Sequence, residues 1–192
     1  VTLPTSEMMQ AINDSILADD VYEEDISTIE LEKYAAKITG KESALLVSSG
    51  TMGNLISSLV HCPRGTEAIM GNKSHSFIYE SGGISAYGGI HSHQLNNNQN
   101  GIIDLNLIKN AIRDRDVHFP ITSLICIENT HNRCYGFPLQ LDYIKLVCDL
   151  AHENNIKVHM DGARFANAIS TLKINPSEIT WKAGIDIMDV LK

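Results

Sequence analysis

The sequence predicts an α/β fold in which a mostly parallel β-sheet is flanked by helices. From Ser43 onward, short apolar segments alternate with segments of helical periodicity, an order typical of a parallel sheet wrapped by helices. The run at residues 123–127 shows no alternation of polar and apolar residues, as expected of a strand covered on both faces. The 192 residues, 43% of them hydrophobic, also suffice to bury a core.

The beginning of the chain is expected to form a helical arm. Residues 8–17 carry apolar side chains at helical spacing, and Thr5 or Ser6 is expected to start this helix. Ser27 and Glu30 form a capping box, which predicts a second helix that ends at a glycine, residue 40. Residues 1–40 are therefore assigned to an N-terminal arm with helices.

Residues 41–192 are expected to form the α/β domain. The expected strands are residues 44–47, 67–70, 121–127, 156–160 and 185–191, and the expected helices are residues 52–60, 105–112 and 141–152. A short helix or turn is expected between the glycine pairs at 82–83 and 88–89. The four cysteines lack C-x-x-C spacing, so we expect reduced and mostly buried thiols in a cytoplasmic protein.

Charge and hydropathy exclude several classes of partner. The formal net charge of −8 argues against a nucleic-acid surface, because phosphate backbones require clustered lysine and arginine. No apolar run reaches the length of a membrane span and no secretory signal pattern opens the chain, so no membrane partner is expected. No spacing of histidine, cysteine and aspartate suits a zinc site, so no metal is expected.

The stretch at residues 158–164, Val-His-Met-Asp-Gly-Ala-Arg, carries the most chemical information. An apolar run ends at Asp161, and Arg164 follows three residues later. In a parallel α/β sheet, ligands bind beyond the carboxyl ends of the strands, where this aspartate is expected to emerge. Its carboxylate could keep the pyridine nitrogen of a cofactor protonated, which makes the ring an electron sink. The alternative is that Asp161 and Gly162 form a plain turn.

Three further segments follow predicted strands and therefore belong to the same edge of the sheet. Ser49, Gly50 and Thr51 open a predicted helix, whose free N–H groups and dipole favour a phosphate; the alternative is an N-cap with nothing bound. His75 could stack on a flat ring or exchange protons, although a lone histidine is more often a surface or packing residue. A polar loop at residues 128–133 follows the strongest strand. Together these are the protein parts needed to hold pyridoxal 5′-phosphate.

Six blocks occur in one order across nearly the whole chain: residues 19–22, 49–54, 74–75 with 79–80, 116–120, 128–132 and 161–164. In this combination they resemble the low-specificity L-threonine aldolases, a family of fold-type-I pyridoxal-phosphate enzymes. The resemblance implies the large domain of that fold, with Ser49, Gly50 and Thr51 at the phosphate. It also implies that His75 stacks on the pyridine ring and that Asp161 pairs with the ring nitrogen.

The same resemblance implies an activity and a substrate site. Arg164 would grip the substrate carboxylate, and His131 would lie near the substrate hydroxyl, with His75 or His131 as the base. The implied reaction is retro-aldol cleavage of L-threonine or L-allo-threonine to glycine and acetaldehyde, without a preference that the sequence can set. The alternatives are another pyridoxal-phosphate lyase that performs β-elimination, or an inactive fragment that lacks the lysine carrying the cofactor.

The resemblance also bears on what this chain contains. The lysine that carries the cofactor is expected shortly beyond Lys192, and the small C-terminal domain of the family is expected to be absent, so this piece is expected to be inactive by itself. A homodimer or homotetramer, with sites shared between subunits, is implied for the complete protein.

Overall fold

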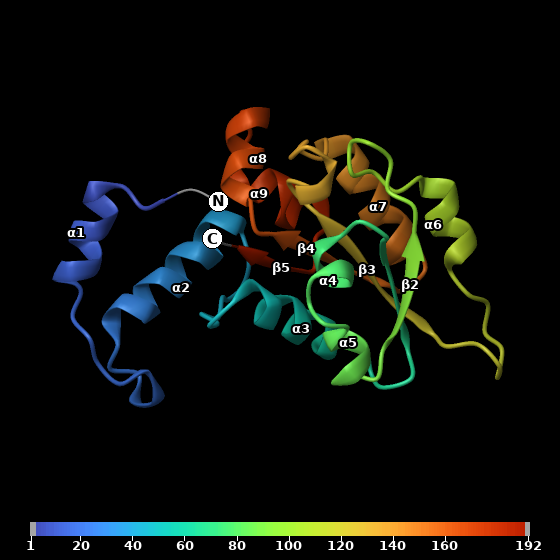
Figure 1. The fold of residues 1–192 in the computed structure, drawn as a ribbon, viewed down its shortest axis with the longest axis horizontal. Helices are drawn as coiled ribbons and strands as arrows, with labels where there is room; N and C mark the ends of the chain where they lie inside the picture. The colour runs from blue at the N-terminus through green and yellow to red at the C-terminus, as the bar shows by residue number, and fades with distance from the viewer. Residues whose placement is uncertain (1–2, 191–192) are drawn as a thin grey trace.

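The computed structural model describes residues 3–190, and its centre is a five-stranded sheet, parallel throughout, in the order β2-β1-β3-β4-β5 (Figure 1). The strands are β1 (Glu67–Gly71), β2 (His91–Leu95), β3 (Thr122–Glu128), β4 (Lys157–Gly162) and β5 (Ile187–Val190). Because β2 and β3 lie on opposite sides of β1, the direction of winding reverses between β1 and β3. The carboxyl ends of strands at such a point form the crevice where these sheets bind ligands. The predicted parallel α/β fold is confirmed.

Helices cover both faces of this sheet and form the N-terminal arm. They are α1 (Ser6–Asp14), α2 (Ile26–Thr39), α3 (Gly50–His61), α4 (His75–Ile78), α5 (Gly83–Ala86), α6 (Leu105–Ala111), α7 (Leu141–Glu153), α8 (Phe165–Leu172) and α9 (Pro176–Ile179), with 3₁₀ turns η1 (Asp20–Tyr22), η2 (Asn132–Cys134) and η3 (Trp181–Ala183). Helix α1 lies at one end of the molecule, away from the sheet, and buries none of its side chains (Figure 1). Among the helices of residues 3–190, none has both the length and the apolar character needed to cross a membrane.

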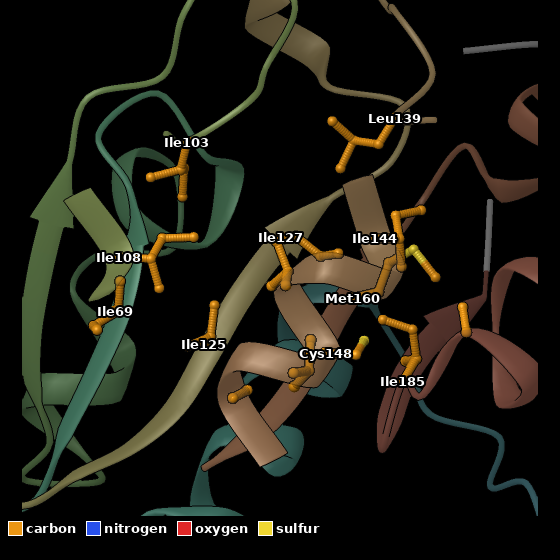
Figure 2. Close-up of a cluster of buried hydrophobic side chains, with 14 of the residues drawn as sticks. Ile69, Ile103, Ile108, Ile125, Ile127, Leu139, Ile144, Cys148, Met160 and Ile185 are labelled. Atoms are coloured by element: carbon orange, nitrogen blue, oxygen red, sulfur yellow. The ribbon is translucent and has the colours of Figure 1, made fainter. Parts of the chain in front are cut away.

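Alternate residues of the central strands face opposite layers, and this divides the core in two. Ile69, Ile125 and Val158 occupy matching register positions on β1, β3 and β4. They belong to the larger cluster, which is completed by residues of α6, α7 and α9 (Figure 2). Leu124 and Cys126 face the other way, into a smaller cluster beside α3 and α5. The side chain of Asp161, on β4, lies on the same face of the sheet as α3, where it accepts a hydrogen bond from Asn54.

Several local expectations are confirmed. Thr5 caps α1 by accepting a hydrogen bond from the backbone of Met8. Gly40 ends α2 in the left-handed conformation, with φ 73°. Helix α5 forms between the two glycine pairs. The four cysteines are all buried and none is in a disulfide within the described chain.

The expected strand at residues 44–47 is wrong. This segment belongs to no strand of the described sheet, and Leu45 and Leu46 remain exposed. An apolar run becomes a strand only where a neighbouring strand supplies the backbone hydrogen bonds. Helix α3 is therefore entered from a loop instead of a strand.

The expected cap of α2 is also wrong. The helix begins at Ile26, and Asp25 is its N-cap, because Oδ1 of Asp25 accepts a hydrogen bond from the backbone N–H of Thr28 at 3.2 Å. Ser27 already lies inside the first turn. Aspartate and serine are comparable caps, so residue type alone did not choose between them.

Strand β2 was not predicted. Its residues, His-Ser-His-Gln-Leu, are mostly polar and none of them is buried. It is an edge strand that pairs with β1 alone, so its backbone joins the sheet without an apolar run to indicate it.

Candidate active site

A cavity of about 260 Å³ lies where the carboxyl ends of the strands meet the start of α3. Its lining residues come from α3, α4, β3, β4, β5 and the segments that follow them: Gly50, Thr51, Asn54, His75, Glu128, Asn132, Asp161, Ala163, Arg164, Asn167 and Asp189. The volume approaches the lower end, about 300 Å³, of common small-molecule sites. Thr51, His75 and Asp161 are thus brought to one cavity as expected, although the described residues form no strand before Thr51. Their chemical roles stay predictions.

The start of α3 offers backbone donors to the cavity. Ser49 is the N-cap, and its Oγ accepts a hydrogen bond from the backbone N–H of Met52 at 3.1 Å. Ser49 does not line the cavity, whereas Gly50 and Thr51 do. The first N–H groups of a helix have no partner within it, so this end of a 12-residue helix suits an anion.

Asp161 is buried and held by two donors. Its Oδ2 accepts a hydrogen bond from Nδ2 of Asn54, and its Oδ1 accepts one from the backbone N–H of Ala163, each at 3.1 Å. Gly162 is the last residue of β4, so the alternative of a plain Asp-Gly turn is wrong. A Cβ at Gly162 would lie 2.4 Å from the backbone oxygen of Asp189. Glycine is needed at this position because the neighbouring strand approaches closely.

Behind Asp161, one amide connects two carboxyl groups to a buried histidine. Nδ2 of Asn54 also donates to Oε1 of Glu80 at 2.8 Å, and Oδ1 of Asn54 lies 2.7 Å from Nε2 of His159. Because the amide nitrogen serves the carboxyl groups, its oxygen must accept, and Nε2 of His159 carries the proton. Burial lowers the pKa of His159 to about 4, so its ring is neutral. His159 is therefore connected to Asp161 through the side chain of Asn54.

His75 begins α4 and presents its ring to the cavity. Its Nδ1 lies 3.0 Å from Oε1 of Glu80, and its side chain is 35% exposed. Burial raises the pKa of Glu80, while hydrogen bonds from Asn54 and His75 lower it in part. The Glu80 contact fixes one ring nitrogen, so Nε2 of His75 is the nitrogen left for a ligand.

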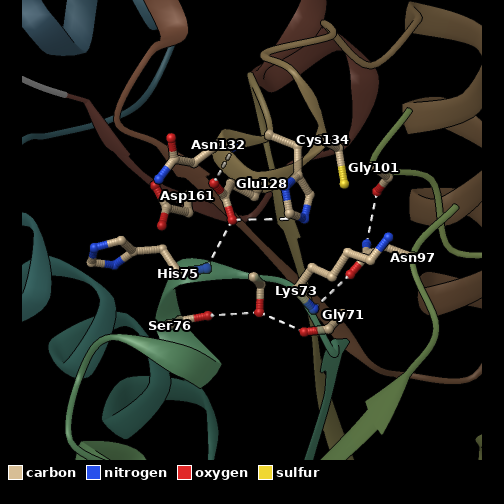
Figure 3. A network of polar contacts seen from close by, with 12 residues as sticks. Gly71, Lys73, His75, Ser76, Asn97, Gly101, Glu128, Asn132, Cys134 and Asp161 are labelled. Atoms are coloured by element: carbon tan, nitrogen blue, oxygen red, sulfur yellow. Dashed lines mark hydrogen bonds and ion pairs between the residues drawn. The ribbon is translucent and has the colours of Figure 1, made fainter. Parts of the chain in front are cut away.

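Glu128 holds the polar loop that follows β3 in place through hydrogen bonds to backbone N–H groups. Its Oε2 accepts a hydrogen bond from the backbone N–H of His75 at 2.9 Å, and its Oε1 accepts one from that of Asn132 at 2.8 Å. Figure 3 shows Glu128 between these two residues, with Asp161 beside them. Burial raises the pKa of Glu128 to about 6. One carboxyl group therefore joins the segments after β1 and β3 at the point where the winding reverses.

The structure does not bring His131 into the cavity. Its side chain is 1% exposed, and neither ring nitrogen has a hydrogen-bond partner among the described residues. Nε2 lies 3.8 Å from Oε2 of Glu128. Burial, followed by the charge of Lys73, lowers the pKa of His131 to about 4. The expected place near a substrate hydroxyl is not supported by this geometry, because a buried ring cannot reach a proton on a ligand.

We expect replacement of His131 by phenylalanine to make the protein less sensitive to acid. In the unfolded chain a histidine takes up a proton below a pKa of about 6.5, whereas the buried ring of His131 stays neutral down to about 4. His131 therefore costs stability progressively as the pH falls between these values. The free energy of unfolding in urea, measured near pH 7 and near pH 4.5, should change less in His131→Phe than in the wild type. His118, which is exposed, offers the matched control His118→Phe. Equal acid sensitivity of the wild type and His131→Phe would contradict the prediction.

Arg164 supplies a cation at the rim. It precedes α8 and lines the cavity, and its guanidinium makes no hydrogen bond or ion pair with any residue from 3 to 190. A guanidinium in this position can bind a carboxylate through two parallel hydrogen bonds.

Among the cavity residues that were assigned no role from the sequence, Asn54 and Asp189 each left a signal. Asn54 follows Thr51 by three positions, a spacing that places both on one face of α3. Asp189 is a carboxyl group inside an otherwise apolar strand, where a charge without a function is rare.

His75, Glu80 and Asp161 come close enough together that their ligand atoms lie within 4.8 Å of one another. The amide of Asn54 already donates to both carboxyl groups, and Glu80 also faces His75. These atoms are therefore engaged with one another, and we assign no metal to them.

A sequence profile of the beta-eliminating lyase family matches residues 1–191. The chain belongs to the beta-eliminating lyase family. A probable low-specificity L-threonine aldolase of Arabidopsis thaliana is 45% identical over 186 residues, which are 95% of this chain and 52% of the relative. A low-specificity L-threonine aldolase of Escherichia coli is 36% identical over 180 residues, which are 94% of this chain and 53% of the relative. This member of the beta-eliminating lyase family thus spans about half the length of the curated relatives it matches.

Solved structures agree with the family. A threonine aldolase from Leishmania major superposes with a TM-score of 0.77 at 21% identity, covering 96% of this chain and 53% of that one. A putative L-allo-threonine aldolase from Listeria monocytogenes gives a TM-score of 0.73 at 25% identity, covering 91% and 46%. The first match shows the fold alone. The expected resemblance to the threonine aldolases is confirmed for this beta-eliminating lyase family member.

Proposed function

We propose that the complete protein is a pyridoxal-phosphate-dependent aldehyde-lyase that cleaves L-threonine and L-allo-threonine to glycine and acetaldehyde. The observation that carries the proposal is the cavity itself, in which a helix N-terminus, a histidine ring, a buried aspartate and an arginine without a partner among residues 3–190 surround one space. The homology to low-specificity threonine aldolases supports the choice of reaction.

The residues present fit pyridoxal phosphate. The backbone N–H groups of Gly50 and Thr51 suit a phosphate, and they provide local attraction that the net charge of −8 does not. Asp161 suits a protonated ring nitrogen, and Asn54 ties it to α3 about one helical turn, about 5.4 Å, beyond these N–H groups. His75 presents a flat ring to the same cavity.

Each residue then has a separate task. The cofactor, when bound, supplies an electron sink for the bond that breaks. Arg164 would bind the substrate carboxylate through two hydrogen bonds and so fix the orientation of the bond that breaks. His75 accepts the hydroxyl proton at Nε2, since its Nδ1 faces Glu80. Asp161 holds the proton on the ring nitrogen, because a neighbouring negative charge favours the charged form of the ring.

The products of the reaction distinguish aldol cleavage from β-elimination. The complete protein, supplied with pyridoxal phosphate and L-threonine, is expected to form equal amounts of glycine and acetaldehyde without ammonia. Release of ammonia and a 2-oxo acid would contradict the proposal and favour β-elimination, the reaction in the name of the matching family.

Lys192 lies outside the described residues. We propose that the lysine that would carry the cofactor follows Lys192 in the complete protein. Reduction with borohydride in the presence of pyridoxal phosphate should give little covalent adduct with the 192-residue chain and a clear one with the complete protein. A specific adduct at Lys192 would contradict this placement.

We further propose that the complete protein is a homodimer or homotetramer. The support is the exposure of large apolar side chains on the N-terminal arm, among them Met8, Ile12, Val21 and Tyr22. Exposed apolar clusters commonly mark interfaces between proteins. Light scattering would give the mass, and a monomer would contradict the proposal.

A further inference from the structure

Asp189 lines the cavity, and one of its two carboxyl oxygens is left without a partner. It lies on β5 directly opposite Asp161 in the β4–β5 register. Its Oδ1 accepts a hydrogen bond from the backbone N–H of Gly162 at 2.6 Å. Its Oδ2 is buried and has no hydrogen-bond partner within residues 3–190. A buried carboxyl oxygen without a donor either carries a proton or receives a donor from a ligand.

The surroundings of Asp189 oppose a negative charge on it. Asp161 faces it from β4, and Glu80 adds a second negative charge. Helix α3 covers it with uncharged groups: a Cβ at Gly53 would lie 3.3 Å from that of Asp189. Burial and then the charge of Asp161 raise the pKa of Asp189 to about 8. The remaining charged or titratable groups that line the cavity are Glu128 from β3, His75 from α4 and Arg164 from the segment after β4.

The hydrogen bonds decide which of the two aspartates keeps a proton. Both oxygens of Asp161 accept hydrogen bonds, from Asn54 and Ala163, and such bonds favour a carboxylate. Among residues 3–190, the only side-chain hydrogen bond that Asp189 accepts is the one on Oδ1. Two neighbouring carboxyl groups in a buried site do not both ionise, so the charge belongs on Asp161 and the proton on Oδ2 of Asp189.

We propose that Asp189 is a neutral carboxylic acid that donates a hydrogen bond from Oδ2 into the cavity and so selects ligands with an acceptor oxygen. The acceptor chemistry is that of a phosphate or a phenolate oxygen, both of which pyridoxal phosphate carries, and in this respect the inference rests on the proposed function. An acid kept neutral by its apolar, negatively charged surroundings is a known way to present a donor at neutral pH. The neutral acid also avoids adding a further negative charge beside an anionic ligand.

The protonation state can be measured without any ligand. In the 192-residue chain labelled with carbon-13, the side-chain carboxyl signal of Asp189 should titrate several pH units above the ordinary aspartate value of about 3.9. Asp189→Asn identifies this signal, and triple-resonance assignment of the wild type replaces that variant if it does not fold. Asp161→Asn should move the titration of Asp189 to lower pH, because it removes the neighbouring charge. A titration of Asp189 near the ordinary value would overturn the proposal.

Ligand binding tests the selective role. The dissociation constant of pyridoxal phosphate, followed by its absorbance, should rise about tenfold between pH 7 and pH 9.5 in the wild type. The dissociation constant should rise less in Asp189→Asn, because asparagine has the same shape as aspartic acid, still donates hydrogen bonds and does not ionise. Asp149→Asn, on the exposed face of α7, is the control that should behave as the wild type. Parallel titrations with pyridoxal and with inorganic phosphate show whether the phenolate or the phosphate oxygen is the acceptor.

The outcomes separate this inference from the proposed function. The same pH dependence in the wild type and Asp189→Asn would overturn the selective role of Asp189 and leave the cofactor in place. No binding of pyridoxal phosphate at either pH would contradict the proposed cofactor, while the carboxyl titration would still decide the state of Asp189.

Discussion

Replacement of Asp161 by alanine in the complete protein is expected to lower the rate constant of threonine cleavage by roughly 10²–10³-fold. The carboxylate of Asp161 lies near the end of β4 and lines the cavity. Its two oxygens accept hydrogen bonds from Asn54 and from the backbone N–H of Ala163. Without it the ring nitrogen loses the charge that keeps it protonated, and electron density from the breaking bond is accepted less well. Acetaldehyde release gives kcat, and cofactor absorbance gives the dissociation constant.

The loss should appear in kcat far more than in cofactor binding, because the proposed site for the phosphate is the start of α3 and not Asp161. Asp149→Asn, which changes a carboxyl group on the exposed face of α7, should leave both quantities unchanged. Near-normal cleavage by Asp161→Ala would count against the whole assignment of the cavity.

Replacement of Ile125 by alanine is expected to lower the free energy of unfolding by about 2–5 kcal/mol. Ile125 is 0% exposed on the central strand β3, and its register partners Ile69 and Val158 are equally buried. The shortened side chain leaves a cavity between the sheet and α7 that the packed neighbours cannot fill. Urea unfolding of the 192-residue chain measures the loss.

Two matched variants separate packing from other effects. Ile125→Val removes one methyl group and should cost about 0.5–1.5 kcal/mol. Ile121→Ala, at a side chain that is 67% exposed, should change stability by no more than about 0.5 kcal/mol. Equal losses at Ile125 and Ile121 would show that the cluster in Figure 2 is not the stabilising core.

Signals that lie within one segment of the chain were readable from the sequence. The unbroken apolar run before Glu128 indicated a strand buried on both faces, and β3 is that strand. The order of strands and helices indicated parallel pairing, which in turn placed His75 and Asp161 at one edge of the sheet, whereas Thr51 reaches the same cavity without the strand that was expected before it. These features are local because hydrophobic periodicity and chain order act over a few residues.

Features that depend on a neighbour from elsewhere in the chain could not be predicted from the sequence. Residues 44–47 are as apolar as a strand but have no partner strand, whereas the polar β2 has one. His131 lies in a polar loop and still becomes buried, since Glu128 fastens that loop against the segment that contains His75. Burial of a polar side chain is set by what packs over it, which residue type does not reveal.

The sequence by itself determined a parallel α/β sheet with a helix start, a histidine and an aspartate at one edge, because each of these follows from spacing within a segment. Only the tertiary structure decided how the aspartate is held, through Asn54 to His159, and that a second carboxyl group, Asp189, faces it across β4 and β5. The physical reason is that the charge of a buried group depends on the donors and charges that other segments bring within a few ångströms of it. Those distances exist only once the strands have paired.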